Sequence, residues 1–117
     1  MTYINVKGGY ELSSIAEKVV HWCINYFNIN DVERINITLH RDKDLDCWGS
    51  CDEGEEEKTY DIHVYCCQPL RDFVATIVHE MVHVMQWETN KWDGDGESEA
   101  EHFQYKLTDQ LWEQNTL

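Results

Sequence analysis

The apolar and polar positions of this chain repeat with two different periods, and the longer period predicts helices at three places. Between residues 10 and 27, apolar side chains recur every three or four residues, which is the spacing of an amphipathic helix. Residues 97–113 repeat this pattern and predict a last helix. Residues 70–87 are apolar on almost every side, which predicts a helix buried at the centre of the molecule.

The shorter period, an alternation of apolar and polar residues, predicts strands in the middle of the chain. Residues 34–40 and 59–67 alternate in this way and predict half-buried strands. Residues 47–51 predict a short strand between them, with turns at the acidic segments 42–46 and 52–57. We therefore expect a three-stranded, mostly antiparallel sheet and, together with the helices, an α+β fold. The length of 117 residues predicts a single domain over residues 1–117.

The charge of the chain limits the partners that we expect. Twenty-three acidic residues outnumber nine basic residues, and the formal net charge is −14. Binding to nucleic acid needs Lys and Arg against the phosphates, and anionic membranes attract basic segments, so we expect neither as a partner. An acidic surface of this kind favours solubility or basic partners.

The N-terminus and the cysteines indicate a compartment. The first nine residues hold no apolar stretch behind a basic segment, so no signal peptide is expected. No run approaches the roughly 18 apolar residues that a membrane span needs. The five cysteines are an odd number, which favours free thiols in a reducing environment. We therefore expect a cytoplasmic protein.

The sequence His79-Glu80-Met81-Val82-His83 is the H-E-x-x-H motif, and it lies in the segment predicted as the buried helix. A helix turns about 100° per residue, so His83 lies one turn from His79 and both imidazoles can reach one metal ion. Glu80 lies between them and can act on water instead of binding the metal. Two histidines and a glutamate among apolar neighbours are costly unless something satisfies them, which favours a zinc site.

A catalytic zinc ion takes three protein ligands and keeps one open position. Glu97 and Glu101 lie one turn apart at the start of the last predicted helix. We interpret Glu97 as the third ligand and Glu101 as a carboxylate that orients a ligand histidine. Other candidates point elsewhere on the predicted helix or lie on strands: Glu99, His102, His40 and His63.

The two motifs together resemble a known family. H-E-x-x-H at residues 79–83, followed by E-x-x-A-E at residues 97–101, is similar to the pattern of gluzincins, a branch of the zinc metallopeptidases. The order of predicted elements also resembles minimal gluzincin domains, which keep a helix, a small sheet, the active helix and the glutamate helix. The resemblance therefore implies a zincin-like minimal domain that hydrolyses peptide bonds.

The resemblance also implies roles for particular residues. His79, His83 and Glu97 match the three ligands of one zinc ion per chain, which would activate water for attack on a peptide carbonyl. Glu80 matches the general base. Glu101 stands where the family usually has an aspartate. For the group that stabilises the oxyanion, the sequence offers three candidates without choosing among them: Tyr105, Tyr65 and His63.

In enzymes of this kind, the strand before the active helix pairs with extended substrate, so the resemblance implies that a peptide or protein binds along an edge strand at residues 59–67. An alternative function is a non-catalytic or partner-activated zinc-binding module of the same fold. A related protease fold acting in DNA repair is a further alternative, against which the net charge of −14 argues. A second zinc site at Cys47, Cys51, Cys66 and Cys67 is disfavoured because its spacing is unusual.

Overall fold

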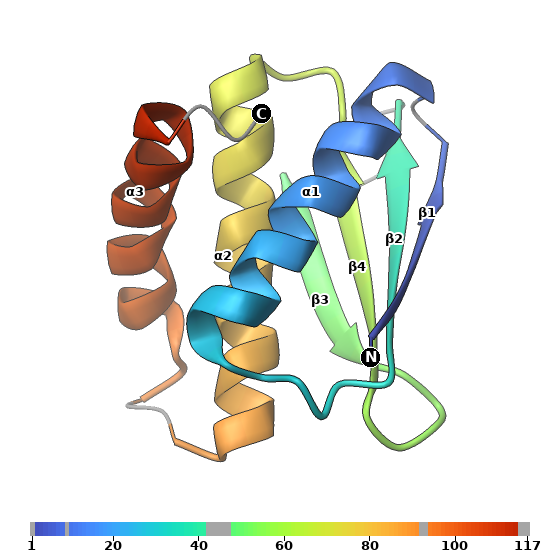
Figure 1. Cartoon of the computed structure of the whole chain (residues 1–117), viewed down its shortest axis with the longest axis vertical. Coiled ribbons are helices and arrows are strands. Elements are labelled where there is room, and N and C mark those ends of the chain that lie inside the picture. The colour runs from blue at the N-terminus through green and yellow to red at the C-terminus, as the bar shows by residue number, and fades with distance from the viewer. Residues whose placement is uncertain (1, 9, 42–47, 92–93, 115–117) are drawn as a thin grey trace.

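The structure, a computed structural model, describes residues 2–8, 10–41, 48–91 and 94–114, which form three helices and four strands. Their order is β1 (Tyr3–Lys7), α1 (Tyr10–Phe27), β2 (Arg34–His40), β3 (Gly49–Glu53), β4 (Thr59–Tyr65), α2 (Leu70–Thr89) and α3 (Glu97–Glu113). Within these residues the chain is a small α+β domain. α1 and α2 cover one face of the sheet, and α3 packs beside α2 on the side away from the strands (Figure 1).

The sheet has four strands in the order β1-β2-β4-β3, and its pairing is mixed. β1 pairs with β2 and β2 pairs with β4 in parallel, whereas β3 pairs with β4 in antiparallel fashion. The expectation of three mostly antiparallel strands is therefore wrong. α1 carries the chain back between β1 and β2, so these two strands run in the same direction. β1 was not predicted from the sequence, and its inward Ile4 and Val6 are only half-buried.

Several element bounds follow the sequence pattern closely. α1, β2 and α3 begin and end where the periodicity predicts. α2 continues two residues beyond its predicted end, and Asn90 then terminates it with a left-handed φ of 55°. β3 runs on into the segment expected to be a turn at residues 52–57. The turn expected at residues 42–46, and Cys47 after it, lie outside the described residues.

The apolar character of α2 on nearly all sides follows from its position. α2 contacts α1, α3 and the two strands β3 and β4, so most of its circumference is covered. Phe73, Ile77 and Met81 of α2 are fully buried and belong to the same core as Ile35 and Ile62 of the sheet. Burying one such side chain contributes about 1.5–3 kcal/mol. Of the helices described, none combines the length and the apolar content that crossing a membrane requires.

The strand order also decides which backbone edge is free. β4 lies between β2 and β3 and is paired on both sides, so the interpretation of residues 59–67 as an edge strand is wrong. The outer strand on this side of the sheet is β3, which contacts α2. A sequence pattern could not reveal this, because the lateral order of the strands depends on long-range pairing.

Candidate metal centre

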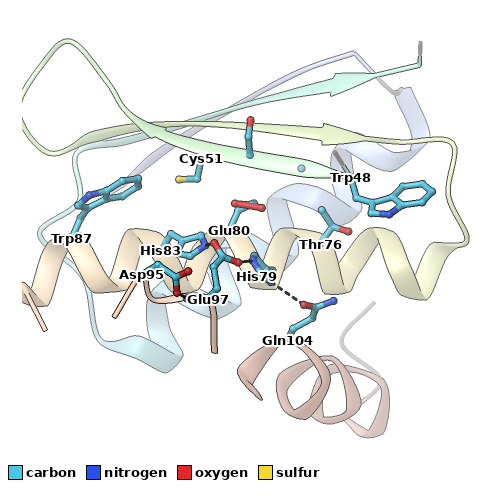
Figure 2. A pocket seen from close by; sticks show the side chains of 12 residues that line it. Trp48, Cys51, Thr76, His79, Glu80, His83, Trp87, Asp95, Glu97 and Gln104 are labelled. Carbon is cyan, nitrogen blue, oxygen red and sulfur yellow. Dashed lines mark hydrogen bonds and ion pairs between the residues drawn. The ribbon is translucent and has the colours of Figure 1, made fainter. Parts of the chain in front are cut away.

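The two histidines of the H-E-x-x-H motif lie side by side on α2, with their ring centroids 5.1 Å apart. They face Glu97, the first residue of α3 (Figure 2). Each of the three residues offers one ligand atom, and these atoms all lie within 4.8 Å of one another. In the described part of the chain, no other set of three or more His, Cys, Asp or Glu side chains meets this distance. The sequence-predicted ligands His79, His83 and Glu97 are thus brought together.

The carboxylate of Glu97 divides its two oxygens between the two histidines. Oε2 lies 2.9 Å from His79 Nε2, and Oε1 lies 2.9 Å from His83 Nε2. α3 begins against the middle of α2, which places its first residue beside both histidines (Figure 1). Asp95 supports the start of α3, because its Oδ1 accepts a hydrogen bond from the Glu97 backbone N–H at 3.0 Å.

A glutamine side chain forms a hydrogen bond with the Nδ1 atom of each imidazole. Gln104 Oε1 lies 2.9 Å from His79 Nδ1, and Gln86 Oε1 lies 2.8 Å from His83 Nδ1. The Gln86 Nε2 atom donates to a backbone oxygen and to a carboxylate, which fixes the orientation of that amide. The Gln86 Oε1 atom therefore accepts a hydrogen bond from His83 Nδ1, which means that the neutral imidazole of His83 carries its proton on Nδ1. This tautomer leaves the Nε2 lone pair facing Glu97.

The donor set fits a zinc ion. Lone pairs on imidazole nitrogens and carboxylate oxygens repel each other at 2.9 Å unless a proton or a metal cation lies between them. Two histidines and one glutamate form a ligand set that catalytic zinc sites use, with a fourth position left open. Histidine ligands in such sites usually donate their second N–H to an oxygen, as both histidines can do here.

Glu80 lies in the same cleft as the ligands, and its side chain is buried. This burial raises the pKa of its carboxyl group to about 7; nearby His83 lowers that pKa, whereas Glu97 and Asp52 raise it further. The β3 backbone passes close above Glu80 at Gly49, where an added Cβ would lie 3.3 Å from Glu80 Oε2. Gly49 thus allows the strand to approach the carboxylate.

The cleft itself has a volume of about 690 Å³ and lies between β3 and α2. Trp48 and Trp87 stand at its two ends, with the metal-ligand cluster between them (Figure 2). Cys51 of β3 points into it near Trp87. The cleft is therefore an open trough, walled on one side by the outer strand of the sheet.

Several other expectations about the site differ from the structure. Glu101 is exposed, and glutamines take the histidine Nδ1 atoms that it was expected to contact. Glu99 contacts Gln86 instead of the ligand cluster. The three candidates for stabilising an oxyanion do not line the cleft: Tyr105, Tyr65 and His63. His63 alternates with buried Ile62 and Val64, so it lies on the outer face of the sheet, where its Nδ1 is 2.9 Å from His40 Nε2.

The cysteines described show no sign of a second metal centre. Cys23, Cys51, Cys66 and Cys67 are free thiols, and none belongs to a described metal-binding group. Burial raises the pKa of the Cys23 and Cys51 thiols far above the ordinary value. Cys47, the remaining member of the set, lies outside the described residues.

The two glutamines were missed at the sequence level, although one of them had a signal. Gln86 is a polar residue on an otherwise apolar segment, three positions after His83 and hence on the same side of the helix. Gln104 had no comparable signal, because the last helix is polar on most of its surface.

Comparison with known proteins assigns no family: no protein-family model, no curated protein and no solved structure matches the chain. The chemistry of the site is therefore derived from its own residues.

Proposed function

We propose that this chain is a zinc-dependent hydrolase and, more particularly, a metallopeptidase of the gluzincin type. The observation that carries the proposal is the convergence of His79, His83 and Glu97, whose ligand atoms lie within 4.8 Å of one another, beside buried Glu80. A zincin-like fold is supported by the arrangement of the elements, in which the motif helix lies under a small sheet and the next helix supplies the glutamate.

Each residue of the cleft then has a distinct task. His79, His83 and Glu97 hold the zinc ion. Zinc, when bound, supplies the Lewis acidity that activates water and polarises a carbonyl group. Glu80 accepts a proton at its carboxylate and returns it to the leaving amine. Its burial in the cleft supports this assignment, because a carboxylate with no task would be costly to place there.

Substrate recognition is proposed at β3 instead of residues 59–67. β3 is the outer strand of the sheet on the side of the cleft, and its residues Gly49, Ser50 and Cys51 line the cleft. An extended peptide added beside β3 would lie along the trough, over the cluster of ligands. This mode of binding requires an extended polypeptide, so a peptide or an unfolded protein segment is the proposed substrate.

The test combines zinc content with hydrolysis of an unstructured protein such as casein. Wild-type protein is expected to hold one zinc ion per chain and to cleave the substrate. Glu80→Gln is expected to keep the zinc and to lose cleavage by roughly 100-fold or more, the scale of a lost general base. Glu101→Gln makes the same chemical change at an exposed position of α3 and should leave both properties unchanged.

The outcomes separate the possible functions. Full hydrolysis by Glu80→Gln would exclude Glu80 as the base. Zinc binding without hydrolysis by wild-type protein would favour the non-catalytic or partner-activated module. Failure of the wild-type protein to bind zinc would reject the metal centre and the proposed hydrolase together.

A further inference from the structure

Gln86 is a fully buried polar side chain on α2, and its amide contacts three different groups. Its Oε1 atom accepts from His83 Nδ1 at 2.8 Å. Its Nε2 atom donates to Gly96 O at 2.9 Å and to Glu99 Oε1 at 3.0 Å. The amide oxygen of Gln86 thus accepts a hydrogen bond from α2, and the amide nitrogen donates hydrogen bonds to the start of α3.

The position of Gly96 makes this arrangement specific. Gly96 is the N-cap of α3 and directly precedes the ligand Glu97. Its φ of 79° is left-handed, a region that glycine adopts without strain. A Cβ atom at this position would collide with the Gln86 amide, with Gln86 Cδ only 2.8 Å away. The backbone at Gly96 therefore packs directly against the Gln86 amide that hydrogen-bonds His83.

We infer that Gln86 is a positioning residue that sets two of the three metal ligands at once. Its carbonyl oxygen keeps His83 in the tautomer with Nε2 free for the metal. Its amide hydrogens hold the residue next to Glu97, so this one side chain contacts both a histidine ligand on α2 and the start of α3 that carries the carboxylate ligand. This inference rests on the proposed metal centre and does not depend on peptide hydrolysis.

Gln104 provides an internal comparison. It contacts His79 Nδ1 and lies on α3, and no described contact joins it to the loop before Glu97. Loss of the Gln104 amide would disturb one ligand, whereas loss of the Gln86 amide would disturb two. A similar change of side chain at the two positions should therefore weaken metal binding unequally, more strongly at Gln86.

The experiment measures zinc affinity by competition with a chromophoric chelator, and the absorption spectrum of the cobalt(II)-loaded protein. Gln86→Met keeps the approximate volume of the side chain and removes the amide. We expect a zinc affinity lower by roughly 100-fold, the upper part of the range for groups that orient ligands, and an altered cobalt spectrum. Gln104→Met should lower the affinity by roughly 10-fold. Gln110→Met, about 20 Å from Glu97 along the axis of α3, is the matched control and should bind as wild type.

A second pair of changes tests the two ends of the amide separately. Gln86→Glu retains an acceptor for His83 Nδ1, but its second carboxylate oxygen would face Gly96 O and Glu99 Oε1, which repel it, so zinc affinity should fall at least as far as in Gln86→Met. Gly96→Ala leaves every polar group in place and forces the amide aside, so it should weaken zinc binding as well. Unchanged zinc affinity and cobalt spectrum in folded Gln86→Met protein would overturn the inference, as would a Gln86→Glu variant that binds zinc as tightly as wild type.

One measurement needs no variant and holds if the Gln86 variants fail to fold. Long-range ¹H–¹⁵N NMR spectra of the zinc-loaded wild type should show His83 protonated at Nδ1 and bound to zinc through Nε2. Ligation through Nδ1 would overturn the inference while leaving a zinc site in place. Zinc binding without hydrolysis would reject only the peptidase proposal, and absence of zinc binding would reject the inference as well.

Discussion

Glu97 Oε1 lies 2.9 Å from His83 Nε2, although the two residues belong to different helices. α2 supplies both histidines from adjacent turns, whereas α3 supplies its carboxylate from its first residue. The candidate metal centre therefore depends on how α3 packs against α2 as much as on the H-E-x-x-H motif. The following predictions test the parts of this arrangement.

Glu97→Ala is expected to weaken zinc binding by at least about 100-fold, because loss of a direct ligand should exceed the 10–100-fold cost of losing an orienting group. Zinc retained after dialysis, measured by mass spectrometry, checks this. Glu101→Ala removes a carboxylate from the exposed surface one turn further along α3 and should retain one zinc per chain. Equal zinc content in the two variants would move the third ligand away from Glu97.

Gly49→Ala is expected to push β3 away from α2. The added Cβ would lie 2.6 Å from Thr76 Cγ2, closer than side-chain atoms tolerate. We expect destabilisation of about 1–3 kcal/mol, measured by urea unfolding, and reduced hydrolysis of casein. Thr76→Ser removes the obstructing methyl group and keeps the hydroxyl that donates to Asp72 O. The double variant should therefore recover part of the loss, and a single variant as stable as wild type would contradict the close approach.

Removal of zinc is expected to lower the thermal stability of the chain. At a free zinc concentration 100 times the dissociation constant, binding stabilises the folded state by about 2.7 kcal/mol. For a domain of this size the corresponding increase in Tm is roughly 10 °C. Calorimetry of zinc-loaded and chelator-treated protein checks the difference. In Glu97→Ala the two Tm values should nearly coincide, and a wild-type Tm insensitive to the chelator would argue against the metal centre.

The cysteines are expected to react with iodoacetamide at very different rates. Burial raises the pKa of Cys23 and Cys51, so at pH 8 these thiols stay protonated and are poor nucleophiles. Cys67 is exposed and should be alkylated before the other described cysteines, as peptide mapping by mass spectrometry can show. The peptide containing Cys67 should lose its early label in Cys67→Ser, with the Cys23 peptide still unlabelled. Early labelling of Cys23 in the folded protein would contradict its burial.

The sequence was most informative where neighbours along the chain are also neighbours in space. His79 and His83 share a helix face by their spacing alone, and the bounds of α1 and α3 followed from local periodicity. Strand order was beyond this reasoning, because β1 pairs with β2 in a register that joins residues about thirty positions apart, such as Tyr3 and Arg34. No local pattern distinguishes an inner strand from an outer one in such a sheet.

The partner of His79 was missed for a related reason. At about 100° per residue, Glu101 and Gln104 both lie within about 40° of Glu97 around α3. Which of them reaches the imidazole depends on how α3 crosses α2, and that is set by packing between the helices. The structure selects Gln104 and leaves Glu101 exposed. A neutral amide takes the place where the resemblance suggested a carboxylate.

The short connection between α2 and α3 has a consequence for the order of folding. All three ligands fall within residues 79–97, whereas the sheet needs contacts between strands much further apart in sequence. Closing a short loop costs less chain entropy than assembling distant strands. On the proposed zinc function, the helix pair would bind the ion before the sheet is complete, and the ion would hold α2 and α3 together early in folding. By the same reasoning, α3 would be the first element to detach when zinc is withdrawn, with amide hydrogens that exchange ahead of those in β2 and β4.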